Sequence, residues 1–239
     1  MRIAVFGGSF NPVHNGHIEL AKAVHEQAGY DKVLFVPAYH SPFKDLPSGA
    51  SDEDRLCMLH LALDGFDWAC IEDCELKRGG VSYTYETVEF LERKYTASCA
   101  PDEKLTGKLG LVIGADLVSG FSKWYRADEL ASKVDIVLAR RKLDSDASGQ
   151  TPHNTEATAA DEPASQKLPV LPFAHYELEN PYVDVSSSEI RDAVHAAAGN
   201  AVGRATNAPN ATKTASRKKL QALVPESVCD YILERRLYE

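Results

Sequence analysis

Residues 7–17 read Gly-Gly-Ser-Phe-Asn-Pro-Val-His-Asn-Gly-His, and this stretch decides which fold the chain can adopt. It follows a short apolar run, Ile3–Phe6, and precedes an amphipathic run, Ile18–Ala28. The order is therefore a strand, a glycine-rich turn and a helix. In such a unit the backbone N–H groups of the turn and the N-terminus of the helix form a binding site for phosphate.

Two histidines near the end of this stretch add chemistry to the phosphate site. His14 and His17 are three residues apart at the start of the expected helix, so both imidazoles project from one face. Gly16 removes a Cβ where a ligand must approach the backbone closely. Paired histidines can donate hydrogen bonds to the charge that develops during phosphoryl or nucleotidyl transfer. The stretch has neither Gly-x-Gly-x-x-Gly nor Gly-Lys-Ser/Thr, which excludes the dinucleotide-binding fingerprint and the Walker loop.

Further along the chain, apolar runs alternate with helical patterns, which is typical of a parallel α/β sheet. The predicted fold is a Rossmann-like parallel sheet with helices on both faces and a C-terminal helical segment at 220–238. Ligands bind at the carboxyl ends of the strands in such sheets, so the glycine-rich stretch and Asp116 face one edge. We expect strands at residues 2–6, 32–37, 68–76, 109–114 and 135–139, and helices at 16–28, 52–63, 85–94 and 127–132.

The length of 239 residues suits a single domain, 1–239. Two runs that are poor in large apolar side chains, 144–167 and 199–216, indicate flexible surface insertions. A formal net charge of -9 argues against general binding to nucleic acid or to anionic membranes. Because no apolar run is long enough to span a bilayer and no signal-peptide pattern follows Met1, we expect a cytoplasmic protein.

The five cysteines are an odd number scattered along the chain, which indicates reduced thiols rather than a disulfide framework. Cys57, His60, Cys70 and Cys74 have a spacing that loosely resembles a zinc site. The first two fall on an expected helix and the last two on an expected strand, so we interpret these cysteines as small buried side chains.

Residues 185–191, Val-Ser-Ser-Ser-Glu-Ile-Arg, supply a second candidate for binding polyphosphate. Hydroxyl groups such as that of Ser187 stand at the start of a predicted helix, where they can cap it and donate to phosphate. Arg191 lies on the first turns of the same helix and can reach the same oxygens. Lys44, in a proline-containing loop after the second strand, can add a mobile point charge. An ordinary helix cap and surface lysine remain the alternatives.

An aromatic pair indicates a third group of site residues. Trp124 stands at a loop-to-helix junction between two cationic residues, where it either covers the core or offers a stacking platform. A cationic pyridine ring gains about 0.5–2 kcal/mol from an indole face beyond its burial. Tyr125 and Thr84 can donate hydrogen bonds to a carboxylate on that ring.

Together these motifs resemble a known family. Residues 14–17 are similar to the His-x-Gly-His signature of the nucleotidyltransferase superfamily, and residues 185–191 to its Ile-Ser-Ser-Thr-x-Ile-Arg motif, with Val and Ser at the first and fourth positions. Residues 77–84, Lys-Arg-Gly-Gly-Val-Ser-Tyr-Thr, and Gly-Ala-Asp at 114–116 with Trp-Tyr eight residues after the Asp resemble the bacterial-type nicotinate-nucleotide adenylyltransferases.

The resemblance implies transfer of the adenylyl group of ATP to nicotinate mononucleotide, giving deamido-NAD and pyrophosphate, with no covalent enzyme intermediate. It implies that Mg²⁺ bridges phosphate oxygens and is held by the substrate rather than by protein ligands. His14, His17 and Arg191 would then be catalytic. ATP would contact Gly7, Gly8, Ser9, Phe10, His14, Gly16, His17, Lys44, Ser187 and Arg191, and the pyridine nucleotide Thr84, Asp116, Trp124 and Tyr125.

Two other interpretations share part of this pattern. Another adenylyl- or cytidylyltransferase of the superfamily would have the same histidine motif, but it is not expected to have the Trp124-Tyr125 pair. A nucleotide-binding sensor without catalysis would not need every cation of the site. The sequence leaves open the oligomeric state and the choice between nicotinate and nicotinamide mononucleotide.

Overall fold

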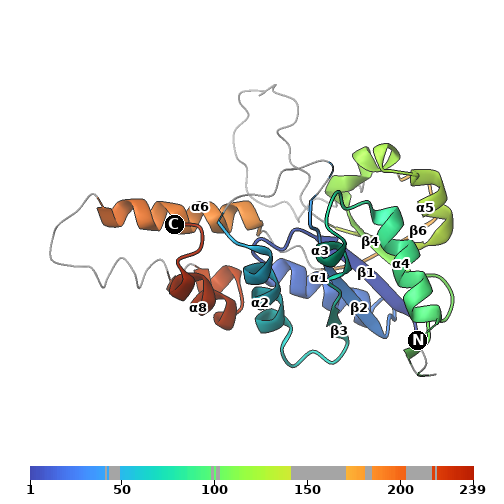
Figure 1. Cartoon of the computed structure of the whole chain (residues 1–239), viewed down its shortest axis with the longest axis horizontal. Helices are drawn as coiled ribbons and strands as arrows, with labels where there is room; N and C mark the ends of the chain where they lie inside the picture. Colours follow the sequence, from blue (N-terminus) through green and yellow to red (C-terminus); the bar gives the residue numbers. More distant parts are fainter. Residues whose placement is uncertain are drawn as a thin grey trace, which may run out of the picture.

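The computed structural model describes residues 1–40, 42, 49–97, 100, 103–140, 171–180, 185–202, 217–218 and 220–239. The described strands form one sheet in the order β3-β2-β1-β4-β5-β6, in which every neighbouring pair is parallel (Figure 1). This confirms the predicted Rossmann-like α/β fold. The strands are β1 (Ile3–Gly8), β2 (Lys32–Pro37), β3 (Ala69–Ile71), β4 (Gly110–Gly114), β5 (Asp135–Ala139) and β6 (His175–Glu177).

Helices cover both faces of this sheet, as predicted. One face packs against α1, α2, α6 and α8, and the other against α4, η2 and α5. A short α3 joins β3 to α4. The bounds are α1 (Asn15–Glu26), α2 (Asp52–Leu63), α3 (Cys74–Arg78), α4 (Thr84–Thr96), the 3-10 helix η2 (Ala115–Lys123), α5 (Ala127–Lys133), α6 (Ser187–Val202) and α8 (Glu226–Arg235).

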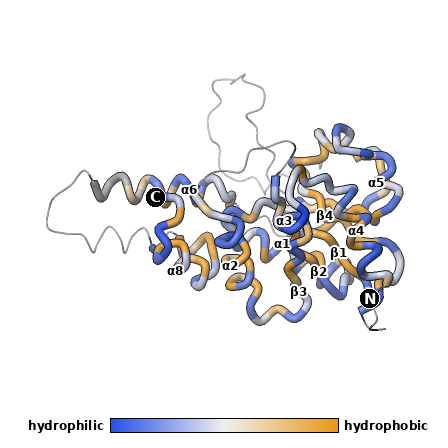
Figure 2. Tube along the Cα trace, in the orientation of Figure 1, coloured by the Kyte–Doolittle hydropathy of each residue, from blue (hydrophilic) through white to orange (hydrophobic). Residues whose placement is uncertain are grey.

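Alternation along the strands produces two hydrophobic layers, because successive side chains of a strand point to opposite faces. In β1, Ala4 and Phe6 belong to the layer under α1 and α2, whereas Ile3 and Val5 belong to the layer under α4 and α5. The central strands are buried on both faces, and they run through hydrophobic segments of the chain in Figure 2. A sheet covered in this way is typical of parallel α/β proteins.

The strand order reverses direction at β1. The chain passes from β1 to β2 and β3 on one side, and then returns to place β4 on the other side of β1. Such a switch point leaves a crevice at the carboxyl ends of β1 and β4, and ligands of α/β proteins bind in crevices of this kind. β1 ends at Gly8 and β4 at Gly114, so the two sequence motifs that follow these strands open into one crevice.

Two expected elements need correction. We predicted that the first strand ends at residue 6, before the glycines. In the structure Gly7 and Gly8 pair with Val36 and Pro37 and prolong β1. We also predicted one strand over 68–76. Only Ala69–Ile71 is strand, and Glu72, whose carboxylate accepts from Lys94 and Tyr95 of α4, follows it.

Cys74 therefore begins α3 and does not continue a strand. The short β6 and the helix η2 were not predicted; β6 has three residues and pairs only with β5. The remaining boundaries agree with the prediction to within two residues at each end. The C-terminal helical segment is confirmed by a helical turn at 220–223 followed by α8.

The predicted insertion at 144–167 lies outside the described residues. Of the second predicted insertion, residues 199–202 form the end of α6, and 203–216 lie outside the described residues. Within the described part of the chain, no helix is long and apolar enough to cross a membrane.

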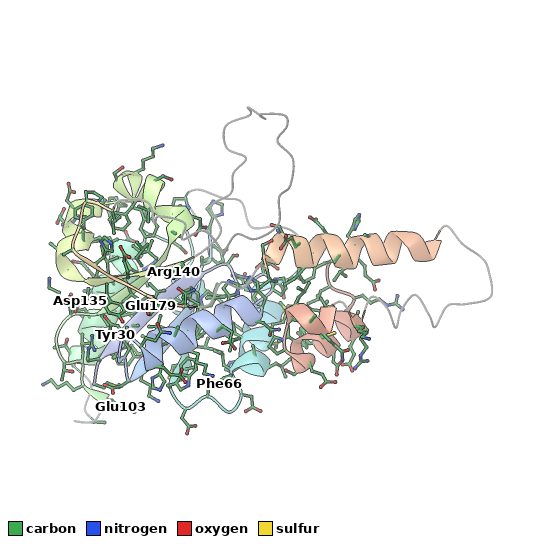
Figure 3. All side chains as sticks on the ribbon, turned by 180° about the vertical axis from the view of Figure 1, so that it is seen from behind. Tyr30, Phe66, Glu103, Asp135, Arg140 and Glu179 are labelled. Atoms are coloured by element: carbon green, nitrogen blue, oxygen red, sulfur yellow. The ribbon has the colours of Figure 1, made fainter. Side chains whose placement is uncertain are left out.

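The amino ends of the strands close around Tyr30. Its ring is buried and lies under the guanidinium of Arg2, 4.5 Å from ring centroid to Cζ. Burial raises the pKa of the Tyr30 hydroxyl, and the nearby carboxylate of Asp135 adds to this shift (Figure 3). The ring occupies the space in which a side chain at Gly110 would begin, because an added Cβ would lie 2.6 Å from Tyr30 Cε1.

We therefore expect Gly110→Ala to destabilise the fold by about 1–3 kcal/mol through overpacking. The free energy of unfolding in urea measures this change. Gly120→Ala is the matched control, because a Cβ added there meets nothing within 4 Å. Equal stability of the two variants would contradict the packing that we describe.

Candidate active site

His14 and His17 stack on one another at the start of α1. Their ring centroids are 3.6 Å apart at an interplanar angle of 28°, and both residues are buried. His14 has extended backbone dihedrals as the N-cap residue of α1, and His17 is the third residue of the helix. The prediction that both imidazoles project to the same place is confirmed.

A backbone hydrogen bond sets the tautomer of His17. The N–H of His14 donates to Nδ1 of His17 over 3.2 Å. Because Nδ1 accepts a hydrogen bond, the neutral ring carries its own proton on Nε2. His17 is therefore prepared to donate from Nε2, which is the role that a developing negative charge requires.

Phe10 packs against the histidine pair through the ring of His17. Its backbone is in the left-handed region, with φ 45°, and its ring is fully buried. The ring contacts those of Phe6, Phe35 and His17 at centroid distances of 5.6, 5.5 and 5.0 Å. A non-glycine residue in the left-handed region is held there by its surroundings, and such residues cluster at functional sites.

Gly16 also makes room for a contact within the protein. We expected its missing Cβ to leave room for a ligand, and this remains a prediction. In the structure an added Cβ would lie 3.0 Å from Cγ1 of Val185 and 3.2 Å from Nδ1 of His14. The glycine therefore allows the second sequence motif to pack against the histidine pair.

The second motif binds the turn that precedes the histidines, residues 9–13, which we call the motif turn. Ser186 forms a capping box with Glu189 at the start of α6, through bonds of 2.9 and 3.2 Å. This leaves the Ser187 hydroxyl to donate to the carbonyl of Pro12 over 2.9 Å. A hydroxyl has one proton, and in this arrangement Ser187 donates it to the turn. Toward a ligand, the Ser187 hydroxyl can then act only as a hydrogen-bond acceptor.

Arg191 also binds the motif turn. One terminal nitrogen, Nη1, donates to the carbonyl of Asn11 over 2.7 Å, and Nη2 donates to the Ser188 hydroxyl over 3.0 Å. A guanidinium has five N–H donors, so these two bonds leave others for an anionic ligand. The structure thus brings Ser187 and Arg191 to the histidine motif, from which they are separated by more than 170 residues of sequence.

Two further residues bind the motif turn and were not predicted as site residues from the sequence. Arg55 of α2 is 1 % exposed and donates from Nη1 to the carbonyl of Ser9 over 2.8 Å. Tyr238 donates its hydroxyl to Oδ1 of Asn11 over 2.6 Å, in a buried environment. Arg55 had a recognisable signal, since it shares the apolar face of its helix with Met58 and Leu59. Tyr238 had none that distinguishes it from a core tyrosine.

The predicted pyridine-binding residues form a second group. Tyr125 is 48 % exposed and packs on the ring of Tyr83, with centroids 4.8 Å apart, beside Thr84 at the start of α4. Trp124 is half-buried and packs against Phe121 of the core at 5.1 Å. Part of the Trp124 ring therefore covers the core, which was one of its two predicted roles.

Asp116 lies in the first turn of η2, directly after β4, as the sequence predicted. Lys44 lies outside the described residues. An open cavity of about 420 Å³ is lined partly by Asn15 and Phe66. A larger cavity lies beside the loop before α4.

This larger cavity has a volume of about 550 Å³ and is lined by Tyr39, His40, Asp52, Gly80 and Val81. On one side Asp52 accepts from Arg55, which binds the motif turn. On the other side the loop before α4 is fixed by its hydrogen bonds to the end of β2, from Tyr39 N–H to the hydroxyl of Ser82 and from Ser82 N–H to the carbonyl of His40. The cavity thus borders the start of α2, the end of β2 and the loop before α4.

The cysteines are free thiols in the described residues. Cys74 and Cys229 are buried as expected, and burial raises the pKa of the Cys74 thiol to about 12. Cys57 is exposed, which differs from the prediction of buried side chains. Among the residues that the structure describes, no group of His, Cys, Asp and Glu side chains is arranged to hold a metal ion.

Comparison with known proteins places these features in a family. Residues 5–193 match the cytidylyltransferase-like family. A nicotinate-nucleotide adenylyltransferase of Treponema pallidum is 39% identical over 238 residues, covering 100% of this chain and 99% of the relative. One of Streptococcus pneumoniae is 34% identical, covering 99% and 88%. The fold is also that of a Plasmodium falciparum nicotinic acid mononucleotide adenylyltransferase in complex with NaAD, with a TM-score of 0.63, 14% identity and coverage of 99% and 97%.

The contact between Gly16 and Val185 makes a testable prediction. Alanine is favoured over glycine inside a helix by about 1 kcal/mol. We nevertheless expect Gly16→Ala to lower the free energy of unfolding by about 1 kcal/mol or more, because its Cβ crowds Val185. In a Val185→Ala background the same substitution should cost less, because only the contact with His14 remains. Denaturant unfolding of the four variants tests this, and equal effects in both backgrounds would contradict it.

Proposed function

This chain belongs to the nicotinate-nucleotide adenylyltransferases of the cytidylyltransferase-like family, and from that membership we propose that it transfers the adenylyl group of ATP to nicotinate mononucleotide. The products are deamido-NAD and pyrophosphate, so the enzyme acts in NAD synthesis. The observation that carries the proposal is the stacked His14–His17 pair at the carboxyl end of β1, beside the switch point of the sheet. Because ATP is a cytoplasmic metabolite, we propose that the enzyme works there.

The reaction is an in-line displacement at phosphorus. A phosphate oxygen of the mononucleotide attacks the α-phosphorus of ATP, a new P–O bond forms, and the bond to pyrophosphate breaks. Negative charge develops on the oxygens around the α-phosphorus and on the leaving group. A protein accelerates such a step mainly by positioning the two substrates and by donating hydrogen bonds to that charge.

His17 and His14 supply these hydrogen bonds in our proposal. The proton of the neutral His17 ring is on Nε2 because its Nδ1 accepts a hydrogen bond from the backbone N–H of His14. The burial of both rings keeps the donors in a region of low dielectric constant, where their bonds to an oxyanion are stronger than in water. Their mutual stacking and the contact of His17 with Phe10 fix the ring orientations in advance.

The triphosphate requires further positive charge. Arg191 retains N–H donors beyond the two that bind the chain itself, and it lies at the N-terminal part of α6, where the helix dipole also favours an anion. Lys44 remains a proposed contributor on sequence alone. When bound, Mg²⁺ would neutralise charge on the phosphate oxygens, and those oxygens would be its main ligands.

The pyridine ring is proposed to bind at the second group of residues. Tyr125 offers an exposed aromatic face, and Arg126 lies beside it with its guanidinium 4.0 Å from the centroid of Tyr85. Trp124, Thr84 and Asp116 complete the proposed pocket. A carboxylate on the ring favours donors and cations, whereas an amide would leave part of them unsatisfied.

A pyrophosphate-release assay with ATP and Mg²⁺ tests the proposed acceptor. We expect turnover with nicotinate mononucleotide to exceed that with nicotinamide mononucleotide and with phosphopantetheine. Tyr125→Ala should raise the KM for the pyridine nucleotide about tenfold and leave that for ATP unchanged, because it removes only the acceptor platform. Turnover confined to another acceptor would contradict the pocket, and none with any acceptor would favour the sensor interpretation.

The histidine mechanism has its own test. His17→Ala removes a proposed donor to the transition state, so kcat should fall by about 10²–10³. His60→Ala, at an exposed histidine of α2, is the control and should not change kcat. Circular dichroism and the unfolding midpoint confirm that each variant folds. Turnover at the wild-type rate in His17→Ala would show that the mechanism is wrong.

A further inference from the structure

The oxygen atoms of the motif turn are bound on one side by side chains from distant parts of the chain. Arg55 of α2 binds the carbonyl of Ser9, and Ser187 binds that of Pro12. Both oxygens of Asn11 are occupied, the carbonyl by Arg191 and Oδ1 by Tyr238. Side chains of α2, of α6 and of the C-terminal segment therefore bind four acceptor oxygens within residues 9–12.

This arrangement decides where the N–H groups of the turn point. In a planar trans peptide the C=O and N–H groups point in opposite directions. The Ser9 carbonyl faces Arg55, so the N–H of Phe10 points to the opposite side, and the Pro12 carbonyl likewise directs the N–H of Val13 away from Ser187. The backbone N–H groups of such a turn can bind the phosphates of a nucleotide.

We propose that Tyr238 is a positioning residue for this phosphate-binding turn, acting through its hydrogen bond to the side chain of Asn11. The inference rests on the proposed function, since it assigns the turn to ATP. Tyr238 does not itself touch the reacting groups. It fixes Asn11, which lies between the Ser9–Phe10 and Pro12–Val13 peptides and whose carbonyl accepts from Arg191.

The surroundings of Tyr238 suit this role. The residue is 7% exposed, and its backbone is left-handed, with φ 67°. Its hydroxyl is a donor at neutral pH, as in any tyrosine, and burial raises its pKa further. The ring also fills the space next to Gly49, where an added Cβ would lie 2.9 Å from Tyr238 Cδ1. Packing thus holds the ring so that the hydroxyl reaches Asn11.

Tyr231 provides a matched control in the same C-terminal part of the chain. Its hydroxyl donates to Oδ1 of Asp54 over 2.9 Å, a bond of similar length that joins side chains of α8 and α2. Asp54 caps α2 with Ser51, and its carboxylate also accepts from Tyr231 and Arg235. Both substitutions remove a hydroxyl that donates to a side chain, but only the hydroxyl of Tyr238 donates to the motif turn.

The experiment compares Tyr238→Phe with Tyr231→Phe in the full chain. Both variants keep the aromatic ring, so both should fold. We expect Tyr238→Phe to weaken ATP binding about tenfold, measured by isothermal titration calorimetry, and to lower kcat/KM for ATP by about ten- to a hundredfold. The KM for nicotinate mononucleotide should stay within about twofold of wild type, as should every constant of Tyr231→Phe.

A double-mutant cycle with Asn11→Ala identifies the path of the effect. In that background Tyr238→Phe should cause no further loss of ATP binding, because the acceptor is already absent. Equal ATP binding by the Tyr238→Phe and Tyr231→Phe variants would overturn the inference and leave the proposed function intact. Absence of turnover in the wild type would contradict the proposed function, whereas the binding measurement still judges the role of Tyr238.

Discussion

The carbonyl oxygens of the motif turn must be satisfied inside the protein, and this requirement connects the parts of the structure. A turn that presents its N–H groups to an anion has to turn its carbonyls the other way, where they become buried acceptors that cost free energy if unpaired. Arg55, Ser187 and Arg191 provide the donors. The packing of α2 and α6 against the sheet is therefore also the packing that orients the site.

The same requirement explains why charged and polar side chains occur inside this domain. A buried guanidinium such as that of Arg55 is tolerated when its N–H groups are paired, here with Ser9 and with the carboxylate of Asp52. A fixed guanidinium next to the turn also adds positive potential near the proposed phosphate site. Stability and the electrostatics of the site thus depend on the same contacts.

Small residues and aromatic rings together fix the positions of the histidine rings. Gly16 lets Val185 approach the histidine pair, and Gly8 leaves space for the ring of Phe10, whose atoms would be 3.0 Å from an added Cβ. Phe10 in turn packs against His17. Close packing of this kind restricts the imidazole rings to one arrangement before any ligand binds, which reduces the reorganisation needed during the reaction.

The sequence by itself determined the α/β fold, the position of the histidine pair after the first strand, and the family. These features depend on local periodicity and on short motifs. It could not determine that β3 ends at Ile71, that Gly16 makes room for Val185, or that Arg55 and Tyr238 bind the motif turn. Those contacts join residues far apart along the chain, and only the packing of helices on the sheet brings their atoms within hydrogen-bonding distance.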